Sequence, residues 1–279
     1  MTFFNLSEVI DMVIVESKKL SALSHHYDLD EMSSYFSSSA DVLEAIRILE
    51  NYQLIQDLEE HDKALLIKHI KIKKYYHNQL IYKQNTTCHD INLILDGVLK
   101  LGWTTSSGKC LTDAFLPAGM LINIVPIFSN RPFVHDYFSQ GSTVIANIPA
   151  DIFKRVIQNN AKALTQLLKL ICARTQINRE KLFFYSTASL RTRLAKELLF
   201  LVDFHSQQDN NQFLIKLKLN QENFAELLGT TRQSINKEFA WFSEHEILEV
   251  KYNQILILNY DALNTIAQGE NSLSATKFY

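Results

Sequence analysis

The stretch "TTRQSINK" gathers side chains of the types that read DNA. Arginine can form two parallel hydrogen bonds with guanine, and glutamine can pair with the edge of adenine. Arg232, Gln233 and Lys237 would line one exposed side of a short helix. Thr231, which can cap this helix, and Ser234 suit phosphate oxygens, as do the free backbone N–H groups of a helix start. The sequence therefore predicts a recognition helix whose first two turns enter the DNA major groove.

A second helix must hold the recognition helix in place, and the preceding residues "QENFAELLG" predict it. Ala225 is small where a crossing helix has to come close, and Gly229 stands at the turn, where a left-handed backbone costs least. Ile235 falls on the inner face of the recognition helix. These three residues lie four, eight and fourteen positions after Gln221. Two helices joined by a three-residue turn containing glycine form a helix-turn-helix.

The segment "EILEVKYNQILILNYDAL" follows, with two short apolar runs around "KYNQ". This pattern predicts a β-hairpin wing, and Lys251 at its tip can reach the DNA backbone. The alternative is a helical hairpin whose charged residues are merely solvated. The polar projecting face and the wing together disfavour that alternative.

The chain before this domain shows two different hydrophobic patterns in succession. Between residues 67 and 147, short alternating segments separated by turn residues predict an antiparallel barrel or jelly roll. After Pro149 the pattern predicts one long helix with residues at alternating spacings of four and three. We expect this stripe to be the seam of a homodimer rather than a contact within one domain. The seam residues are Leu164, Leu168, Ile171, Thr175, Asn178 and Leu182.

Composition limits the class of protein. The 279 residues suffice for two domains, and 47% of them are hydrophobic. The net charge of the whole chain is −2, which does not indicate a polyanionic partner. No apolar run approaches the roughly 18 residues of a membrane span. Glu8 and Asp11 interrupt the N-terminal apolar stretch, which is therefore not read as a secretory signal. Three scattered cysteines are typical of reduced thiols, so we expect a cytoplasmic protein without membrane contact.

The segment "LNQENFAELLGTTRQSINKEFAWFSEHEIL" resembles a signature of the form "LxxxxLAxxxGxxRxxVxRxLxxLxxxGLI". This is the helix-turn-helix of the cyclic-AMP receptor / fumarate-nitrate-reduction regulator (CRP/FNR) family of bacterial transcription factors. The upstream "INLILDGVLKLGWTTSSGKCLTDAFLPAGML" resembles the sensory barrel of that family. The resemblance covers about residues 52 to 267. It implies that Arg232, Gln233 and Lys237 read bases and that Thr231 and Ser234 bind phosphates.

The resemblance implies an α+β fold in four parts. We expect an N-terminal helical extension of unassigned role (1–45), a cyclic-nucleotide-binding-like antiparallel β-barrel or jelly roll (46–150), a long dimerisation helix (151–187) and a C-terminal winged helix-turn-helix (188–270). The extension could pack on the barrel or contact a partner such as RNA polymerase. The sequence assigns neither role to it.

Several positions depart from the family pattern. Gln233 stands where glutamate is common, and Lys237 replaces an arginine and loses its two-pronged geometry. Glu238 replaces a small apolar residue, and Glu246 replaces a turn glycine. Between residues 216 and 261 there are five Lys/Arg and seven Asp/Glu. This acidic balance predicts few phosphate contacts and weak nonspecific affinity for DNA.

The effector of the barrel is unknown from sequence. Cyclic-AMP-binding relatives carry a Gly-Glu pair and an arginine that hold ribose and phosphate, but Asn123 and Ile124 stand in the first place and "VHD" in the second. A buried phosphate without its arginine is costly, so cyclic AMP is not expected. Three separated cysteines also argue against an iron-sulfur cluster. Cys88 and Cys110 could form a thiol switch, although buried structural thiols are the more common case.

Two functions compete. The first is a dimeric, sequence-specific transcription regulator that binds a palindromic double-stranded DNA site. The second is a ligand-sensing or protein-interaction module with weak or lost DNA binding, which the acidic balance and Glu238 motivate. An enzyme is not expected, because the chain has no paired carboxylates in a recognisable frame, no nucleophile motif, no phosphate loop and no metal-ligand spacing.

Overall fold

The computed structural model describes residues 39–104, 110–209, 212–215, 219–251 and 254–269. The described residues fall into two compact units. The first unit holds residues up to 99 together with 116–177, and the second holds 100–115 together with 178 onwards. Each unit is described separately below.

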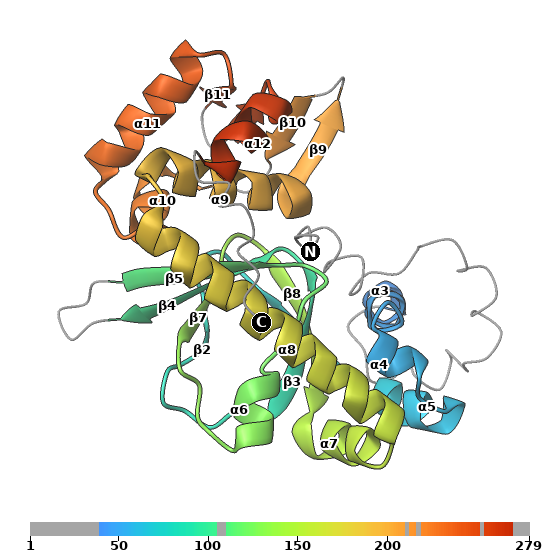
Figure 1. Cartoon of the computed structure of the whole chain (residues 1–279). Helices are drawn as coiled ribbons and strands as arrows, with labels where there is room; N and C mark the ends of the chain where they lie inside the picture. Colours follow the sequence, from blue (N-terminus) through green and yellow to red (C-terminus); the bar gives the residue numbers. More distant parts are fainter. Residues whose placement is uncertain (1–38, 105–109, 210–211, 216–218, 252–253, 270–279) are drawn as a thin grey trace, which may run out of the picture. The chain divides into compact units, whose positions relative to one another are not determined.

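Two four-stranded sheets form the strand-rich part of the chain (Figure 1). One has the order β1-β8-β3-β6 and the other β2-β7-β4-β5. In the first sheet every neighbouring pair is antiparallel. Their bounds are β1 (Lys71–Tyr75), β2 (Leu80–Tyr82), β3 (Asp90–Asp96), β4 (Val98–Thr104), β5 (Cys110–Pro117), β6 (Leu121–Ile122), β7 (Asp136–Ser139) and β8 (Thr143–Pro149). The predicted jelly-roll arrangement is confirmed, although among the described residues the two sheets do not join into a closed barrel.

Alternation along β3 separates the two sides of its sheet. Ile91 and Leu93 belong to a core cluster shared with helices, whereas Asn92 lies opposite Asn147 in the register with β8. Side chains on successive strand residues point to opposite faces, so the amides lie on the face away from this cluster. The tight turn between β3 and β4 needs Gly97, whose φ is +80° and where an added Cβ would lie 2.2 Å from the carbonyl oxygen of Ser142.

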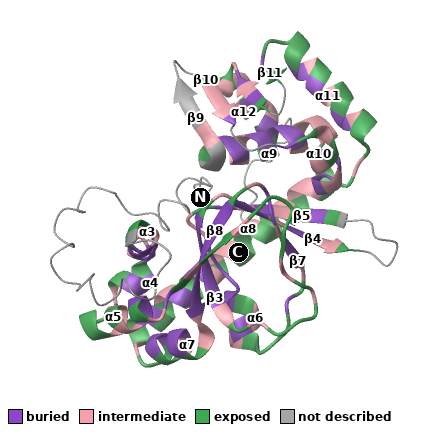
Figure 2. Cartoon of the chain, turned by 180° about the vertical axis from the view of Figure 1, so that it is seen from behind, coloured by how far each residue is buried: buried purple, intermediate pink, exposed green. Residues whose placement is uncertain are grey.

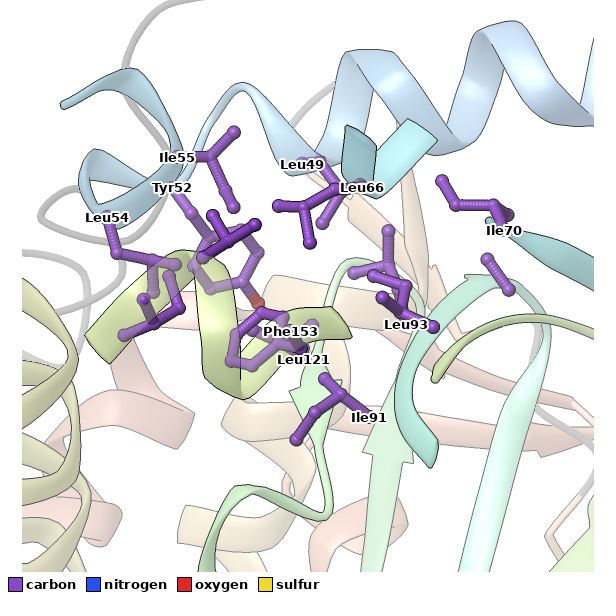
Figure 3. Close-up of a cluster of buried hydrophobic side chains, with 14 of the residues drawn as sticks. Leu49, Tyr52, Leu54, Ile55, Leu66, Ile70, Ile91, Leu93, Leu121 and Phe153 are labelled. Atoms are coloured by element: carbon purple, nitrogen blue, oxygen red, sulfur yellow. The ribbon is translucent and has the colours of Figure 1, made fainter. Parts of the chain in front are cut away.

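Helices cover the other face of the β1-β8-β3-β6 sheet (Figures 1 and 3). In Figure 3, Leu49 and Tyr52 from the helical side approach Leu93 of the sheet and Phe153 of a further helix. Tyr52 fixes this layer, because its hydroxyl donates to the carbonyl oxygen of Gly119 at 2.7 Å and accepts from the Leu121 N–H at 2.7 Å. The helices are α3 (Ser39–Leu49), α4 (Gln53–Gln56), α5 (Glu60–Lys68), α6 (Ile124–Ser129) and α7 (Ala150–Gln158).

Helix α3 crosses the proposed boundary between the N-terminal extension and the barrel domain. Its residues Ala45, Ile48 and Leu49 are buried in the same cluster as the strands. Val42 and Ile46 form a smaller apolar group with Ile67 and Ile72. The part of the extension that is described therefore packs on the sheet, which is one of the two roles left open by the sequence.

The second unit holds α9 (Leu190–His205), β9 (Ser206–Asp209), β10 (Gln212–Ile215), α10 (Gln221–Leu227), α11 (Arg232–Glu244), β11 (Leu248–Lys251), β12 (Gln254–Ile257) and α12 (Tyr260–Gln268). The hairpin of β11 and β12 is the predicted wing, with Lys251 opposite Gln254 at its tip. The wing is larger than the sequence predicts, since β10 and β9 extend it to a sheet of order β11-β12-β10-β9. Figure 2 shows buried residues at the centre of this unit and exposed ones along α11.

The long helix α8 (Ala161–Thr187) has 27 residues. Within the described residues, no helix combines the length and the apolar character that crossing a bilayer would need.

Candidate nucleic-acid interface

The two helices of the predicted helix-turn-helix begin at side-chain caps. The Asn220 side chain accepts a hydrogen bond from the Asn223 N–H at 3.0 Å, and the Asn223 side chain accepts one from the Asn220 N–H at 3.0 Å. The Thr231 hydroxyl accepts from the Ser234 N–H at 3.1 Å at the start of α11. Caps of this kind satisfy N–H groups that have no partner inside the helix. Local sequence therefore fixes where α10 and α11 start.

The turn between the helices has a left-handed backbone conformation at its glycine. Gly229 has a φ of +61°, and the Thr230 N–H donates to the carbonyl oxygen of Ala225 at 2.9 Å. Ala225 is 2% exposed and Ile235 is 0% exposed, so both lie in the contact between α10 and α11. Phe224 and Phe239 meet edge to face with ring centroids 5.3 Å apart. This packing holds α11 by its inner face.

The outer face of α11 carries the residues predicted to read bases. Arg232, Gln233 and Lys237 are exposed, and none of their side chains bonds to another described residue. Thr231 is exposed and Ser234 is half-buried, with their hydroxyl oxygens 2.9 Å apart. The structure thus presents the three candidate base-reading groups together on the first two turns of one helix.

Lys251 lies at the end of β11, with about half of its side chain exposed. Its ammonium group is 3.1 Å from a carboxylate oxygen of Glu249, whose side chain is equally exposed. An exposed pair of this kind contributes at most about 1 kcal/mol, so the ammonium group is readily available to a phosphate.

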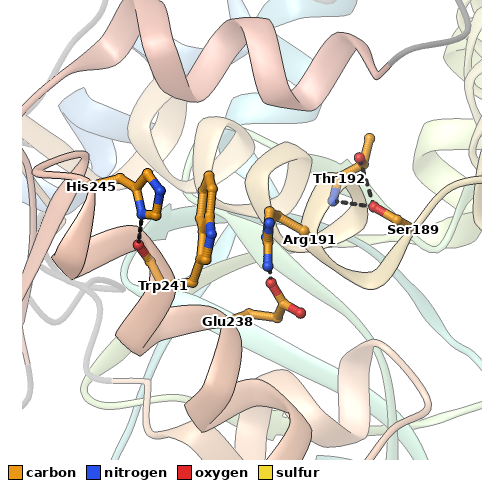
Figure 4. Close-up of polar contacts among 6 residues, drawn as sticks. All are labelled: Ser189, Arg191, Thr192, Glu238, Trp241 and His245. Carbon is orange, nitrogen blue, oxygen red and sulfur yellow. Dashed lines mark hydrogen bonds and ion pairs between the residues drawn. The ribbon is translucent and has the colours of Figure 1, made fainter.

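Glu238 does not stand on the recognition face as an unpaired carboxylate (Figure 4). The Arg191 Nε of α9 donates to the Glu238 carboxylate at 2.7 Å. The Arg191 guanidinium also lies over Trp241, with its central carbon 3.7 Å from the ring centroid. The His245 ring stacks against Trp241 at 3.8 Å. These contacts tie α11 to α9 and neutralise the charge that counted against DNA binding, so Glu238 no longer supports the alternative function.

Removing the Arg191–Glu238 pair should destabilise the second unit. The Glu238 side chain is 18% exposed, so we expect a coupling energy of about 1 kcal/mol between Arg191→Ala and Glu238→Ala in a double-mutant cycle. The matched control is the exposed pair of Lys251 and Glu249, for which the same cycle should give a value near zero. Urea unfolding measures both cycles. Equal coupling energies for the two pairs would contradict a stabilising role of the partly buried Arg191–Glu238 contact.

Glu246 occupies a backbone conformation that favours glycine. Its φ is +56° directly after α11, at the position where the sequence pattern expects a turn glycine. A non-glycine residue in this region costs on the order of 1 kcal/mol. Glu246→Gly should therefore raise the free energy of unfolding by about 1 kcal/mol. Glu244→Gly, two residues earlier in helical backbone, should lower it, and a loss of stability in both variants would refute the explanation.

The long helix α8 has one face packed and another exposed. Ala163, Leu167 and Leu170 are buried, whereas Leu164, Leu168 and Leu182 are 42%, 60% and 75% exposed. Of the other predicted seam residues, Thr175 and Asn178 are exposed, and Ile171 is half-buried against the core of the first unit. Five of the six predicted seam residues thus lie on the open side of the helix.

Arg174 turns to the packed side of α8. Its guanidinium donates to the carbonyl oxygen of Leu121 at 2.7 Å, and it lies beside the Tyr52 hydroxyl. Burial lowers the pKa of Arg174 and raises the pKa of Tyr52. These bonds fix the helix on the sheet.

Asn123 and Ile124, which stand where cyclic-AMP-binding relatives carry a Gly-Glu pair, are both buried in the first unit. Asn123, with a φ of +66°, is buried and donates to the Asn92 side chain at 2.5 Å, while Ile124 is buried apolar surface. No carboxylate therefore occupies the place that holds ribose in the cyclic-AMP-binding pattern. Burial raises the pKa of the Cys88 thiol to about 11, which leaves little thiolate at neutral pH. Among the described residues, no three His, Cys, Asp or Glu side chains are grouped to hold a metal ion.

Comparison with known proteins agrees with this architecture. Residues 192–266 match the family model of the Crp-like helix-turn-helix domain. The fumarate and nitrate reduction regulatory protein of Vibrio cholerae is 25% identical over 191 residues, covering 68% of this chain and 75% of that protein. The CRP-like cAMP-activated global transcriptional regulator of Mycobacterium tuberculosis is 20% identical over 216 residues, covering 77% and 96%.

Solved structures show the same fold. FixK2 from Bradyrhizobium japonicum superposes with a TM-score of 0.63 at 13% identity, covering 71% of this chain and 96% of that one. A CRP-family transcriptional regulator from Thermus thermophilus gives 0.59 at 17% identity, covering 70% and 96%. A jelly roll followed by a Crp-like helix-turn-helix is the architecture that this chain shares with these regulators. The resemblance to the CRP/FNR family is confirmed, and the relatives are regulators rather than enzymes.

Proposed function

We propose that this chain regulates transcription by binding a palindromic DNA site as a homodimer. The observation that carries the proposal is the outer face of α11, where Arg232, Gln233 and Lys237 are exposed and have no bonds to described residues. A capped helix held from behind by Ala225 and Ile235 can insert this face into a major groove as a rigid body.

Each contact has a distinct role in this proposal. Arg232 and Gln233 read base edges through two-pronged hydrogen bonds, and Lys237 adds a single charged donor. Thr231, Ser234 and Lys251 bind phosphate oxygens and set the position of the helix without reading sequence. Because these phosphate contacts are few, affinity for random DNA is weak and selectivity rests on α11.

The exposed stripe of α8 supports the homodimer. Three leucines of this stripe expose apolar surface: Leu164, Leu168 and Leu182. Their spacing keeps them on one side of the helix, as a coiled-coil seam requires. A second copy of the helix buries these side chains, while Thr175 and Asn178 fix the register at the centre of the seam. Two recognition helices related by a twofold axis then read half-sites about one helical turn apart.

A cyclic nucleotide is not the effector in this proposal. The region around Asn123 and Ile124 offers neither a carboxylate for ribose nor an arginine for phosphate. We propose domain boundaries near residues 45, 150 and 187, with α3 from Val42 onwards assigned to the sheet domain. In this proposal the protein acts in the cytoplasm, where the bacterial chromosome lies. RNA polymerase is a candidate partner of the dimer bound at a promoter.

In vitro selection from random DNA duplexes tests the proposal. We expect recovery of a palindrome with half-sites about 10 base pairs apart, centre to centre. Recovery of no preferred site by the folded, dimeric protein would favour the second function, a sensing or interaction module without specific DNA binding. The excess of Asp and Glu between residues 216 and 261 is the observation that keeps this second function in consideration.

A further inference from the structure

A strongly basic surface lies on the first unit, far in sequence from the recognition helix. The 27 residues from 63 to 89 contain six lysines and no aspartate or glutamate, in a chain whose net charge is −2. Lys68 ends α5, and Lys71, Lys73 and Lys74 follow on β1. All four are exposed, and none forms an ion pair with another described residue. We call these four residues the lysine edge.

Three of the four residues of the lysine edge lie on the outer strand of a sheet. β1 is the first strand in the order β1-β8-β3-β6, so within the described residues it has a strand neighbour on one side only. Lysines on such strands discourage pairing with other chains, and this is their usual role. That role does not explain Lys68, which belongs to a helix, nor the absence of any acid over the whole segment. The concentration of charge indicates an acidic occupant.

The N-terminal 38 residues have the complementary charge. They contain six acidic residues against two lysines, a formal charge of −4, with Asp28, Asp30 and Glu31 close together. These residues precede α3 directly. Val42 and Ile46 of α3 pack against Ile72 of β1, so the segment leaves the described structure close to β1, on the face that Ile72 shares with Lys74. Lys71 and Lys73 point to the opposite face of this outer strand, and a segment that reaches them passes around the open side of β1.

Chain length allows the acidic cluster to reach the lysines. Ser39 lies eight positions after Glu31, so this stretch of chain spans at most about 28 Å when extended. A segment tethered this closely has an effective concentration on the order of millimolar, so weak ion pairs suffice for docking. We propose that residues 1–38 dock on the lysine edge of the same chain through their acidic cluster. The docked segment covers the open side of β1.

Zero-length cross-linking of carboxylates to lysines in the full-length protein tests this docking. We expect links between the cluster of Asp28, Asp30 and Glu31 and the lysines of β1, read out by mass spectrometry. Lys162 and Lys169, which are exposed lysines on α8, are the matched controls and should link at least about fivefold less. Raising the salt to 1 M, where the Debye length is about 3 Å, should remove the difference.

Two variants and a mixing experiment sharpen the test. Neutralising the cluster (Asp28→Asn, Asp30→Asn, Glu31→Gln) should abolish the excess of links to β1, as should Lys71→Gln with Lys73→Gln. Both sets change residues that are either exposed or outside the described structure, so the fold should persist. Mixing isotopically light and heavy chains separates links within a chain from links between chains. Links equal to those of the α8 controls, or links found only between chains, would overturn the proposal.

Discussion

Phe239→Ala should destabilise the second unit by about 3–5 kcal/mol and remove DNA binding, while the first unit stays folded. Phe239 is 4% exposed and packs edge to face on Phe224. Truncating a buried phenylalanine loses its transfer free energy and leaves a cavity. Because this ring supports α11 from behind, its removal should release the outer face from its fixed orientation. Urea unfolding followed by tryptophan fluorescence reports on this unit, because Trp103 and Trp241 both belong to it. Replacing Trp103 with phenylalanine restricts the signal to Trp241 on α11.

The matched control lies in the other unit. Phe153 is 0% exposed in the core of the first unit, so Phe153→Ala should carry a similar cost but shift a different unfolding transition. Identical unfolding curves for the two variants, by every probe, would show that the two units unfold as one and would contradict the division between them.

Leu168→Lys should dissociate the homodimer. The side chain is 60% exposed on α8, so the substitution places two charges in the proposed seam while costing the single chain little. Burying an unpaired ammonium group costs at least about 2 kcal/mol, and two copies raise the dimer dissociation constant on the order of 1000-fold. Sedimentation equilibrium measures this constant. A monomer reads only one half-site, so affinity for the palindrome should fall as well.

The control for this prediction is an exposed leucine away from the seam. Leu43 on α3 is 45% exposed, and Leu43→Lys should leave the dissociation constant unchanged. If Leu168→Lys also leaves the dimer intact, α8 is not the seam in the way proposed here.

The sequence predicts the helix-turn-helix well because its determinants are local. The caps at Asn220 and Thr231 act within three residues, and the left-handed turn needs only Gly229. Ala225 and Ile235 belong to adjacent helices, so the spacing alone brings them together. The long helix and its exposed stripe can be predicted for the same reason, since one heptad periodicity covers the whole of α8.

Features that depend on distant parts of the chain were not predicted. Arg191 and Glu238 are 47 residues apart, and no local pattern links them, so Glu238 looked like an unpaired acid. Strand β9 escapes prediction because "SQQD" lacks the β-branched and aromatic residues that mark a strand. Strand β10, "QFLI", carries such residues but is short, and it pairs with β12, which lies about 40 residues further along the chain. The boundary predicted at residue 45 falls inside α3. Composition does not show that this helix belongs to the sheet domain, because its assignment depends on burial against distant strands.

The most direct test of base reading by α11 is the affinity of Arg232→Ala for every single-base variant of the selected half-site. We predict a loss of about 1–3 kcal/mol for the native site, together with relaxed discrimination at one base pair only. Lys251→Ala should instead weaken binding to all sites equally. It should also reduce the slope of log affinity against log salt concentration by the amount of about one phosphate contact. An equal loss on all sequences for Arg232→Ala would contradict base reading by this residue.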